Sequence, residues 1–184
     1  DIVIISGCED INIGDTVCSP DNKIKLPPIT IAAPTLSIDI MVNSGPFAGR
    51  DGKNLNMNKI RERLLREKKA NATLKIDIKD GVIDKITVSG KGELHLAVLL
   101  ETMRREGFEF TVSRPQAILK EIDGQQCEPL ERVHIEVPSE YSGTIIQELS
   151  ARRGELQFLD TDDKNISRLE FIMPTRGLMG CHSN

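Results

Sequence analysis

Residues 50–69 hold the densest group of side chains that could bind a ligand by charge. Eight of them are Lys or Arg and three are Asp or Glu, in a chain whose formal net charge is −4. Ammonium and guanidinium groups at this density can bind nucleic-acid phosphates through salt-sensitive, sequence-independent contacts. A row of cations opposite an apolar stripe is equally typical of any solvated amphipathic helix, so both interpretations stay open.

Nucleotide hydrolysis would require a loop of the form GxxxxGK[ST], in which backbone amides and a lysine contact phosphates and a hydroxyl holds Mg²⁺. The nearest segment, residues 49–54 (GRDGKN), places its glycines too close together and has Asn54 where the hydroxyl is needed. We therefore expect a basic loop with no catalytic or cofactor-binding residue.

Metal binding and acid–base catalysis find little support. Only Cys181 and His182 are neighbouring metal-ligand types, so we expect no metal site. No spacing pairs His95 or His134 with a nucleophile or carboxylate, which favours hydrogen-bonded structural histidines. The four cysteines form neither a CxxC motif nor a disulfide framework, as in free thiols of the reducing cytoplasm.

The apolar pattern predicts which elements position the basic segment. Residues 35–43 alternate as a half-buried strand and are followed by a Gly-rich loop. Asn56 or Asn58 can cap a helix that ends near Ala70, with an apolar side and an opposite cationic side. We assign Met57, Ile60 and Leu64 to the apolar side and Lys59, Arg63 and Arg66 to the cationic side.

The same pattern predicts strands at 74–78 and 83–88 joined by Asp80-Gly81, a helix at 93–106 and a strand at 108–112. The order β-α-β-β-α-β is the split βαβ arrangement of the ferredoxin-like fold. With an aromatic content of 3% and no tryptophan, the cores must be aliphatic, which disfavours a base-stacking RNA module.

The following residues begin the order again. Strands are predicted at 118–122, 132–137, 155–159 and 168–173, with a helix at 140–153 capped by Ser139. Both repeats end a helix with two arginines and a glycine, which suits the helix dipole and a left-handed turn, so these arginines have a purely structural interpretation. Ahead of both repeats, residues 1–6 and 16–18 are strand-like, and the prolines at 27–28 indicate a domain boundary.

Several segments resemble one family. Residues 89–96 (SGKGELHL) are similar to the SGxGELHL segment of the third domain of elongation-factor-G-like translational GTPases. With residues 100–107 (LETMRREG) and 112–115 (VSRP), the chain resembles the BipA/TypA family of translational GTPases. Further similar segments are 43–49 (NSGPFAG), 60–64 (IRERL) and 174–180 (PTRGLMG).

The resemblance implies an α+β chain of two successive ferredoxin-like sandwiches after a short remnant of a β-barrel domain. Residues 1–29 would end β-barrel domain II, residues 30–114 would form domain III, and residues 115–184 would form a truncated domain V. Arg114-Pro115 joins the last two directly, as in BipA/TypA, whereas elongation factor G has a further domain between them.

The resemblance also implies a parent protein that hydrolyses GTP with Mg²⁺ in a GTP-binding domain. This chain would lack both that domain and the C-terminal domain of the family. This segment would be non-catalytic and would dock the factor on the ribosome, on rRNA and ribosomal proteins, during ribosome assembly or stress-related translation. The candidate contacts are Arg50, Lys53, Lys59, Arg63, Arg66, Arg152, Arg153 and Arg176. Residues 181–184 (CHSN) depart from the family, where an aromatic and then an acidic residue are usual.

Other interpretations remain open: another elongation-factor-G-like GTPase, a free-standing ferredoxin-like enzyme such as an acyl-phosphate hydrolase, or a structural hinge. No apolar run approaches the ~20 residues of a membrane span, so we expect no transmembrane segment, and the cysteine pattern favours a cytoplasmic protein. A truncated second sandwich would expose apolar surface and favour self-association.

Overall fold

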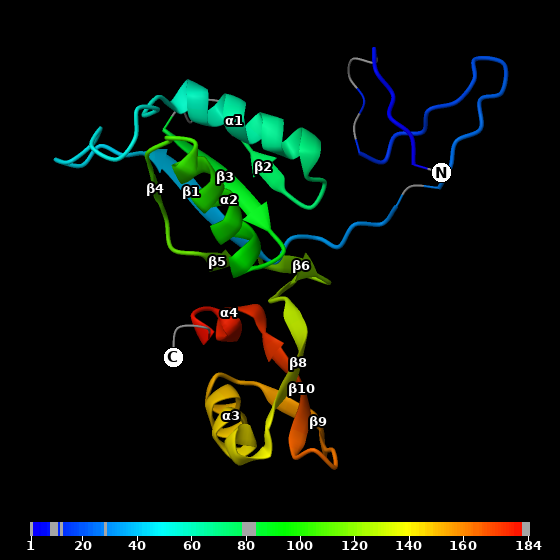
Figure 1. The fold of residues 1–184 in the computed structure, drawn as a ribbon, viewed down its shortest axis with the longest axis vertical. Helices are drawn as coiled ribbons and strands as arrows, with labels where there is room; N and C mark the ends of the chain where they lie inside the picture. Colours follow the sequence, from blue (N-terminus) through cyan, green and yellow to red (C-terminus); the bar gives the residue numbers. More distant parts are fainter. Residues whose placement is uncertain (1, 8–10, 12, 28, 79–83, 182–184) are drawn as a thin grey trace. The chain divides into compact units, whose positions relative to one another are not determined.

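The computed structural model describes residues 2–7, 11, 13–27, 29–78 and 84–181 (Figure 1). The chain divides into two units, one of residues 1–34 and 38–113 and the other of residues 35–37 and 114–184. The described strands form a five-stranded sheet, in which β5 (Gln116–Ala117) pairs with the start of β1 (Leu36–Val42), a three-stranded sheet and a two-stranded sheet.

The first unit is a ferredoxin-like sandwich. Its elements are β1 (Leu36–Val42), α1 (Met57–Ala70), β2 (Lys75–Asp77), β3 (Lys85–Gly90), α2 (Glu93–Arg105) and β4 (Phe110–Val112). The strands lie in the order β2-β3-β1-β4, with β1 antiparallel to β4 and β2 antiparallel to β3. This is the strand order that a split βαβ arrangement produces, so the predicted fold is confirmed. The predicted Asp80-Gly81 turn lies outside the described residues.

The core of the first unit is aliphatic, as the low aromatic content requires. Alternate residues of β1 and β3 are buried and meet the apolar stripes of the two helices. The buried apolar side chains among the described residues of 38–113 are Ile38, Ile40, Ile60, Leu64, Leu74, Ile76, Ile86, Val88, Leu96, Leu99 and Met103. Burying each such side chain is worth roughly 1.5–3 kcal/mol, so this layer fixes where the loop between β1 and α1 begins and ends.

The beginning of α1 is set by its cap. Asn56 is the N-cap, and its side-chain oxygen accepts a hydrogen bond from the Asn58 backbone N–H at 2.8 Å. This bond satisfies one of the N–H groups that the first turn of a helix leaves without a partner. The helix therefore starts at Met57, directly after the basic loop.

The second unit contains a hairpin and a three-stranded sandwich. Its elements are β5 (Gln116–Ala117), β6 (Lys120–Ile122), β7 (Gln125–Cys127), β8 (Leu130–Pro138), α3 (Ser139–Ala151), β9 (Glu155–Thr161), β10 (Ile166–Pro174) and α4 (Thr175–Leu178). The strand β10 lies between β8 and β9 and is antiparallel to both, which gives the β-α-β-β part of a second ferredoxin-like unit. Its core is Leu149, Leu169, Phe171 and Met173, with Ile145 and Ile146 packed against it.

Two details of the second unit correct the sequence prediction. The predicted strand at 118–122 forms as one arm of the β6–β7 hairpin, which is a separate two-stranded sheet. Ser139 is the first residue of α3 and makes no capping bond, because its hydroxyl contacts Asn165 Oδ1 at 2.7 Å.

The predicted strands near the N-terminus are wrong for the residues that the structure describes. Residues 2–6 and 16–18 have no strand assignment. Ile2 and Ile4 are fully exposed, so their alternation with Val3 and Ile5 has no facing surface to bury against. Alternation alone does not make a strand without a neighbouring strand or a packed face.

Candidate functional site

The loop between β1 and α1, residues 43–56, carries the first of the predicted phosphate contacts. It is fastened to the segment that follows α2, because the Lys53 and Asn54 N–H groups both donate to the Gly107 carbonyl at 3.1 Å. Gly52 lies so close that a Cβ there would be 2.8 Å from the Gly107 oxygen. The loop is therefore held on a rigid support, and a side chain at Gly52 would force it away.

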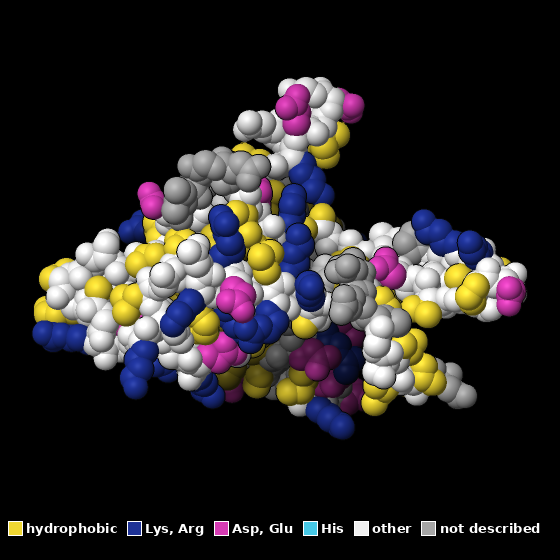
Figure 2. Space-filling view, turned by 90° about the horizontal axis from the view of Figure 1, so that it is seen from above, with side chains coloured by type: hydrophobic (Ala, Val, Ile, Leu, Met, Phe, Trp, Pro, Cys, Tyr) yellow, Lys and Arg dark blue, Asp and Glu magenta, His cyan; other side chains and the backbone are white. Residues whose placement is uncertain are grey.

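Four of the predicted cations are exposed on this loop and on α1. The Arg50 guanidinium lies 4.5 Å from the centroid of the Phe47 ring, within cation–π range. Lys53 is exposed, and Lys59 Nζ lies 3.1 Å from Asn54 Oδ1. Arg66 pairs loosely with Glu62 at 3.7 Å, a contact between exposed side chains that contributes little to stability. Figure 2, seen from above, shows dark blue Lys and Arg side chains interspersed with magenta carboxylates.

Arg63 differs from its predicted neighbours. Its side chain is buried and donates to both oxygens of Glu106, by Nε and Nη2, and to Glu67 through Nη1 at 2.8 Å. The hydrogen bonds that Arg63 donates to Glu106 and Glu67 raise the pKa of Arg63, and the bonds that Glu106 accepts from Arg63 lower the pKa of Glu106.

The prediction that Arg63 lies on the exposed cationic side is therefore wrong. Ile60, Arg63 and Leu64 are spaced i, i+3 and i+4, which places Arg63 beside the buried stripe of α1. Its guanidinium connects α1 to the end of α2, and all three of its nitrogens donate to carboxylates of the fold.

In the second unit, Arg152 also makes hydrogen bonds within the fold. Its Nη1 donates to the carbonyls of Gly177 and Met179 at 3.4 and 3.2 Å, and its Nη2 donates to Glu148 at 3.2 Å. Arg176 lies in α4 next to the first of these carbonyls and is half exposed, with its Nε 2.8 Å from Glu128 Oε2. Arg153 is exposed.

The two helix ends with paired arginines are built differently. Gly107 has a φ of 84°, the left-handed conformation that the sequence predicted for it. After α3, Arg153 takes that conformation instead, with a φ of 68°. Gly154 serves close packing, because a Cβ on it would lie 2.9 Å from the Leu149 carbonyl oxygen.

The histidine and the first glycine of the SGKGELHL segment are structural. His95 Nδ1 lies 3.3 Å from the Lys91 amide nitrogen and Nε2 lies 3.0 Å from Asn71 Nδ2, as expected for a hydrogen-bonded histidine. A Cβ on Gly90 would approach His95 Nδ1 and Leu96 to 2.9 Å, so this glycine lets β3 and α2 meet closely. His134 is different: it is exposed, and its Nδ1 lies 3.8 Å from Glu170 Oε2, beyond hydrogen-bond distance.

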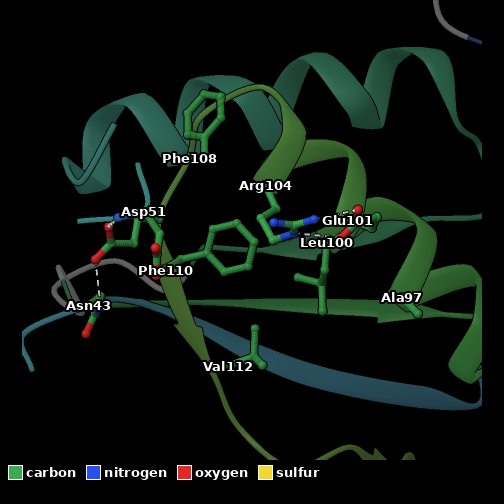
Figure 3. A pocket seen from close by; sticks show the side chains of 10 residues that line it. Asn43, Asp51, Ala97, Leu100, Glu101, Arg104, Phe108, Phe110 and Val112 are labelled. Atoms are coloured by element: carbon green, nitrogen blue, oxygen red, sulfur yellow. Dashed lines mark hydrogen bonds and ion pairs between the residues drawn. The ribbon is translucent and has the colours of Figure 1, made fainter. Parts of the chain in front are cut away.

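A depression of about 550 Å³ lies beside the loop, between α2 and β4 (Figure 3). Its walls are mostly apolar, and the Leu100, Phe110 and Val112 side chains line it. At its rim, Glu101 bonds to Arg104 and Arg105, which lowers the pKa of Glu101 to about 2. This depression does not follow from the sequence, because the apolar residues that line it form no motif.

Among the residues that the structure describes, no group of three or more His, Cys, Asp or Glu could hold a metal ion. No described helix is long and apolar enough to cross a membrane.

Comparison with known proteins adds the family. A family model described as "Elongation factor G C-terminus" matches residues 125–184. Proteins named "Large ribosomal subunit assembly factor BipA" are 46% identical in Bacillus subtilis strain 168, over 98% of this chain and 29% of the relative. The identity is 45% in Synechocystis, over 97% and 30%, and 43% in Escherichia coli K12, over 100% and 30%.

A crystal structure from Thermus thermophilus resembles this chain with a TM-score of 0.47 and 13% sequence identity, over 86% of this chain and 39% of that one. The chain spans about 30% of the length of the curated relatives it matches. Identities of 43–46% extend over nearly the whole chain, and so through both units. The chain therefore belongs to the BipA family.

Proposed function

We propose that this chain is a ribosome-docking segment of a BipA-type translational GTPase, and that it holds and orients the protein on the ribosome during assembly of the large subunit or stress-related translation. In this role the segment does no chemistry. GTP and Mg²⁺ would be bound elsewhere in the parent protein, which would work in the cytoplasm.

The observation that carries the proposal is the group of exposed cations on the anchored loop and on α1. Arg50, Lys53, Lys59 and Arg66 project from a loop and a helix whose backbones are fixed by hydrogen bonds and packing. Folded RNA is bound mostly through its phosphates and its shape, which suits a rigid array of positive charges. The relatives' name, large ribosomal subunit assembly factor, points to a ribosomal particle as the source of that RNA.

In the second unit we propose Arg153 and Arg176 as further contacts. Arg153 is exposed, and Arg176 is half exposed beside Glu128. Each side chain can therefore contact a phosphate without any change in the core of the unit. Arg63 and Arg152 are left out of the proposed surface because both hold structural hydrogen bonds.

Co-sedimentation of the chain with purified large and small ribosomal subunits over a range of salt concentrations tests this function. We expect binding that weakens as salt rises, because each phosphate contact releases about one counterion. Lys53→Gln should lower the slope of log affinity against log salt by about one, whereas Lys164→Gln, an exposed lysine of the other unit, should leave the slope unchanged.

Binding without salt dependence would favour the hinge interpretation, and phosphatase turnover by the purified chain would favour a free-standing enzyme. Equal slopes for the two lysine variants would remove Lys53 from the proposed surface.

We also propose that the second unit can self-associate along β8. This nine-residue strand is at one edge of the sheet, and no other described strand pairs with its outer side. An unpaired edge offers backbone N–H and C=O groups to a strand of another chain, and Leu130 at its start is 63% exposed. Light scattering should show an average mass that rises with concentration, and a constant monomer mass would contradict self-association.

A further inference from the structure

Glu109 occupies an unusual place for a carboxylate, because it lies between the two aromatic residues Phe108 and Phe110 and is only 8% exposed. Its Oε1 accepts hydrogen bonds from Asn43 Nδ2 at 2.7 Å and from the Gly49 N–H at 2.9 Å. Its Oε2 accepts from the N–H groups of Asp51 and Gly52 at 3.0 and 2.9 Å. All four donors belong to the loop that carries Arg50 and Lys53.

Four donors fill the accepting capacity of a carboxylate, and bonds to an ionised acceptor are stronger than those between neutral groups. The N–H of Gly49 is the largest cause of a lowered pKa at Glu109, followed by Asn43 and the other two backbone donors against an opposing effect of burial. The ionised form is therefore the one that the loop binds.

The bonds fix the loop on both sides of Arg50. Gly49 and Asp51, its neighbours in the chain, both donate to Glu109, and Gly49 has a φ of 87° that few other residues could adopt. Lys53 follows Gly52, another donor, and its own N–H is bonded to Gly107. The starting points of both cationic side chains are thus set by one acid.

We propose that Glu109 is the positioning residue of the docking surface: its carboxylate holds residues 43–52 in the conformation that presents Arg50 and Lys53 to RNA phosphates. The inference rests on the proposed function. It assigns an acid a favourable role in binding a polyanion, because an ordered loop loses less conformational freedom on binding than a loose one.

The sign of the effect separates positioning from simple charge. Removing a negative charge near a phosphate-binding surface strengthens binding when only Coulomb attraction matters. Glu109→Gln keeps the shape of the side chain but turns one oxygen into an NH₂ group that faces two donors. The positioning role therefore predicts weaker binding from a substitution that makes the surface more positive.

The matched control is Glu101→Gln, which changes the charge equally within the same unit. Glu101 bonds to Arg104 and Arg105 on its own helix. Binding of both variants and the unaltered chain to purified ribosomal subunits is measured by co-sedimentation, and amide hydrogen exchange at Gly49, Asp51 and Gly52 is followed in the free chain. Asn43→Ala, which removes one donor and leaves the carboxylate, serves as a second and milder variant.

We expect Glu109→Gln to weaken binding about three- to tenfold and to speed exchange at the three amides, with a smaller change in the same direction for Asn43→Ala. Glu101→Gln should bind as tightly as the unaltered chain or more tightly.

If the unaltered chain binds and Glu109→Gln binds equally well or better, the positioning role is wrong while docking stands. If the unaltered chain does not bind either subunit, docking itself fails, and the role of Glu109 in it fails too. Should Glu109→Gln not fold, unchanged binding by Asn43→Ala would overturn the inference.

Discussion

Arg63 and Arg66 lie three residues apart on α1, and they do different work. Arg63 is buried and bonded to Glu106 and Glu67, whereas Arg66 is exposed beside Glu62. Replacing Arg63 removes its hydrogen bonds to two carboxylates, Glu106 and Glu67. The same change at Arg66 removes only a solvent-screened pair.

Arg63→Met should therefore lower the free energy of unfolding by about 2 kcal/mol, because hydrogen bonds to charged groups contribute about that much. Arg66→Met should change it by less than about 0.5 kcal/mol. Urea denaturation followed by circular dichroism measures both, and equal losses would show that Arg63 holds no special place in the fold.

For single residues, the sequence predicts whether a charged side chain is exposed better than it predicts which residue that side chain contacts. The prediction that four cations are exposed is confirmed. Arg50 and Lys53 lie on the loop, Lys59 and Arg66 lie on one side of α1, and both a loop and a helix face are local features of a sequence. Arg63 was misplaced because its partner Glu106 is 43 residues away, and such pairing does not follow from spacing along one helix. Glu109 was missed, although an acid between Phe108 and Phe110 in a strand-like run is a signal that hydrogen-bond donors must be nearby.

Among the elements, the turn of α4 depends on one glycine. A Cβ on Gly177 would lie 2.6 Å from the Arg152 carbonyl oxygen and 3.0 Å from Met173 Cε. Backbone atoms cannot rotate away as a flexible side chain can, so α3 and α4 would have to separate. Gly143, within α3, has nothing within 4 Å of such a Cβ.

Two glycine-to-alanine changes should consequently have opposite signs. Gly177→Ala should destabilise the second unit by about 1–3 kcal/mol through overpacking. Gly143→Ala should stabilise it by about 0.5–1 kcal/mol, because alanine favours the helix over the unfolded chain. Thermal unfolding of the two variants side by side checks this, and a loss of stability from both would contradict the contact at Gly177.

The order of the elements could be predicted because it depends on local periodicity, as in the alternation of Ile38 and Ile40. Contacts between elements could not. The Ser139 hydroxyl was expected to cap α3, and it bonds to Asn165, which comes from the distant β9–β10 turn. The sequence likewise predicts only one strand of the β6–β7 hairpin, because the second arm, Gln125–Cys127, has little apolar character.

For the whole molecule, residues before β1 contribute little to either sandwich. Their described apolar side chains are largely exposed, including Ile2, Ile4 and Ile29. We expect deletion of residues 1–33 to change the free energy of unfolding by less than about 0.5 kcal/mol, since hardly any apolar surface there leaves water on folding. Guanidinium denaturation of both chains tests this, and a markedly less stable shortened chain would show that the segment packs on the first unit.

The N-terminal residues also show that an alternating sequence alone does not predict a strand correctly. Residues 2–6 are rich in isoleucine and valine, which favour strands, yet the strand needs a partner that the described residues do not supply. Family resemblance identified the chain where the physical pattern could not, because motifs such as SGKGELHL carry information about the parent protein that periodicity lacks.

The grip of Arg152 on carbonyls at Gly177 and Met179 has a mechanical consequence. Arg176 directly precedes the first of those two points, so a partner that pulls on its guanidinium pulls on a turn that is fastened to the end of α3. Force applied at Arg176 would therefore pass through these hydrogen bonds to the end of α3, so that the turn and the helix end would move together.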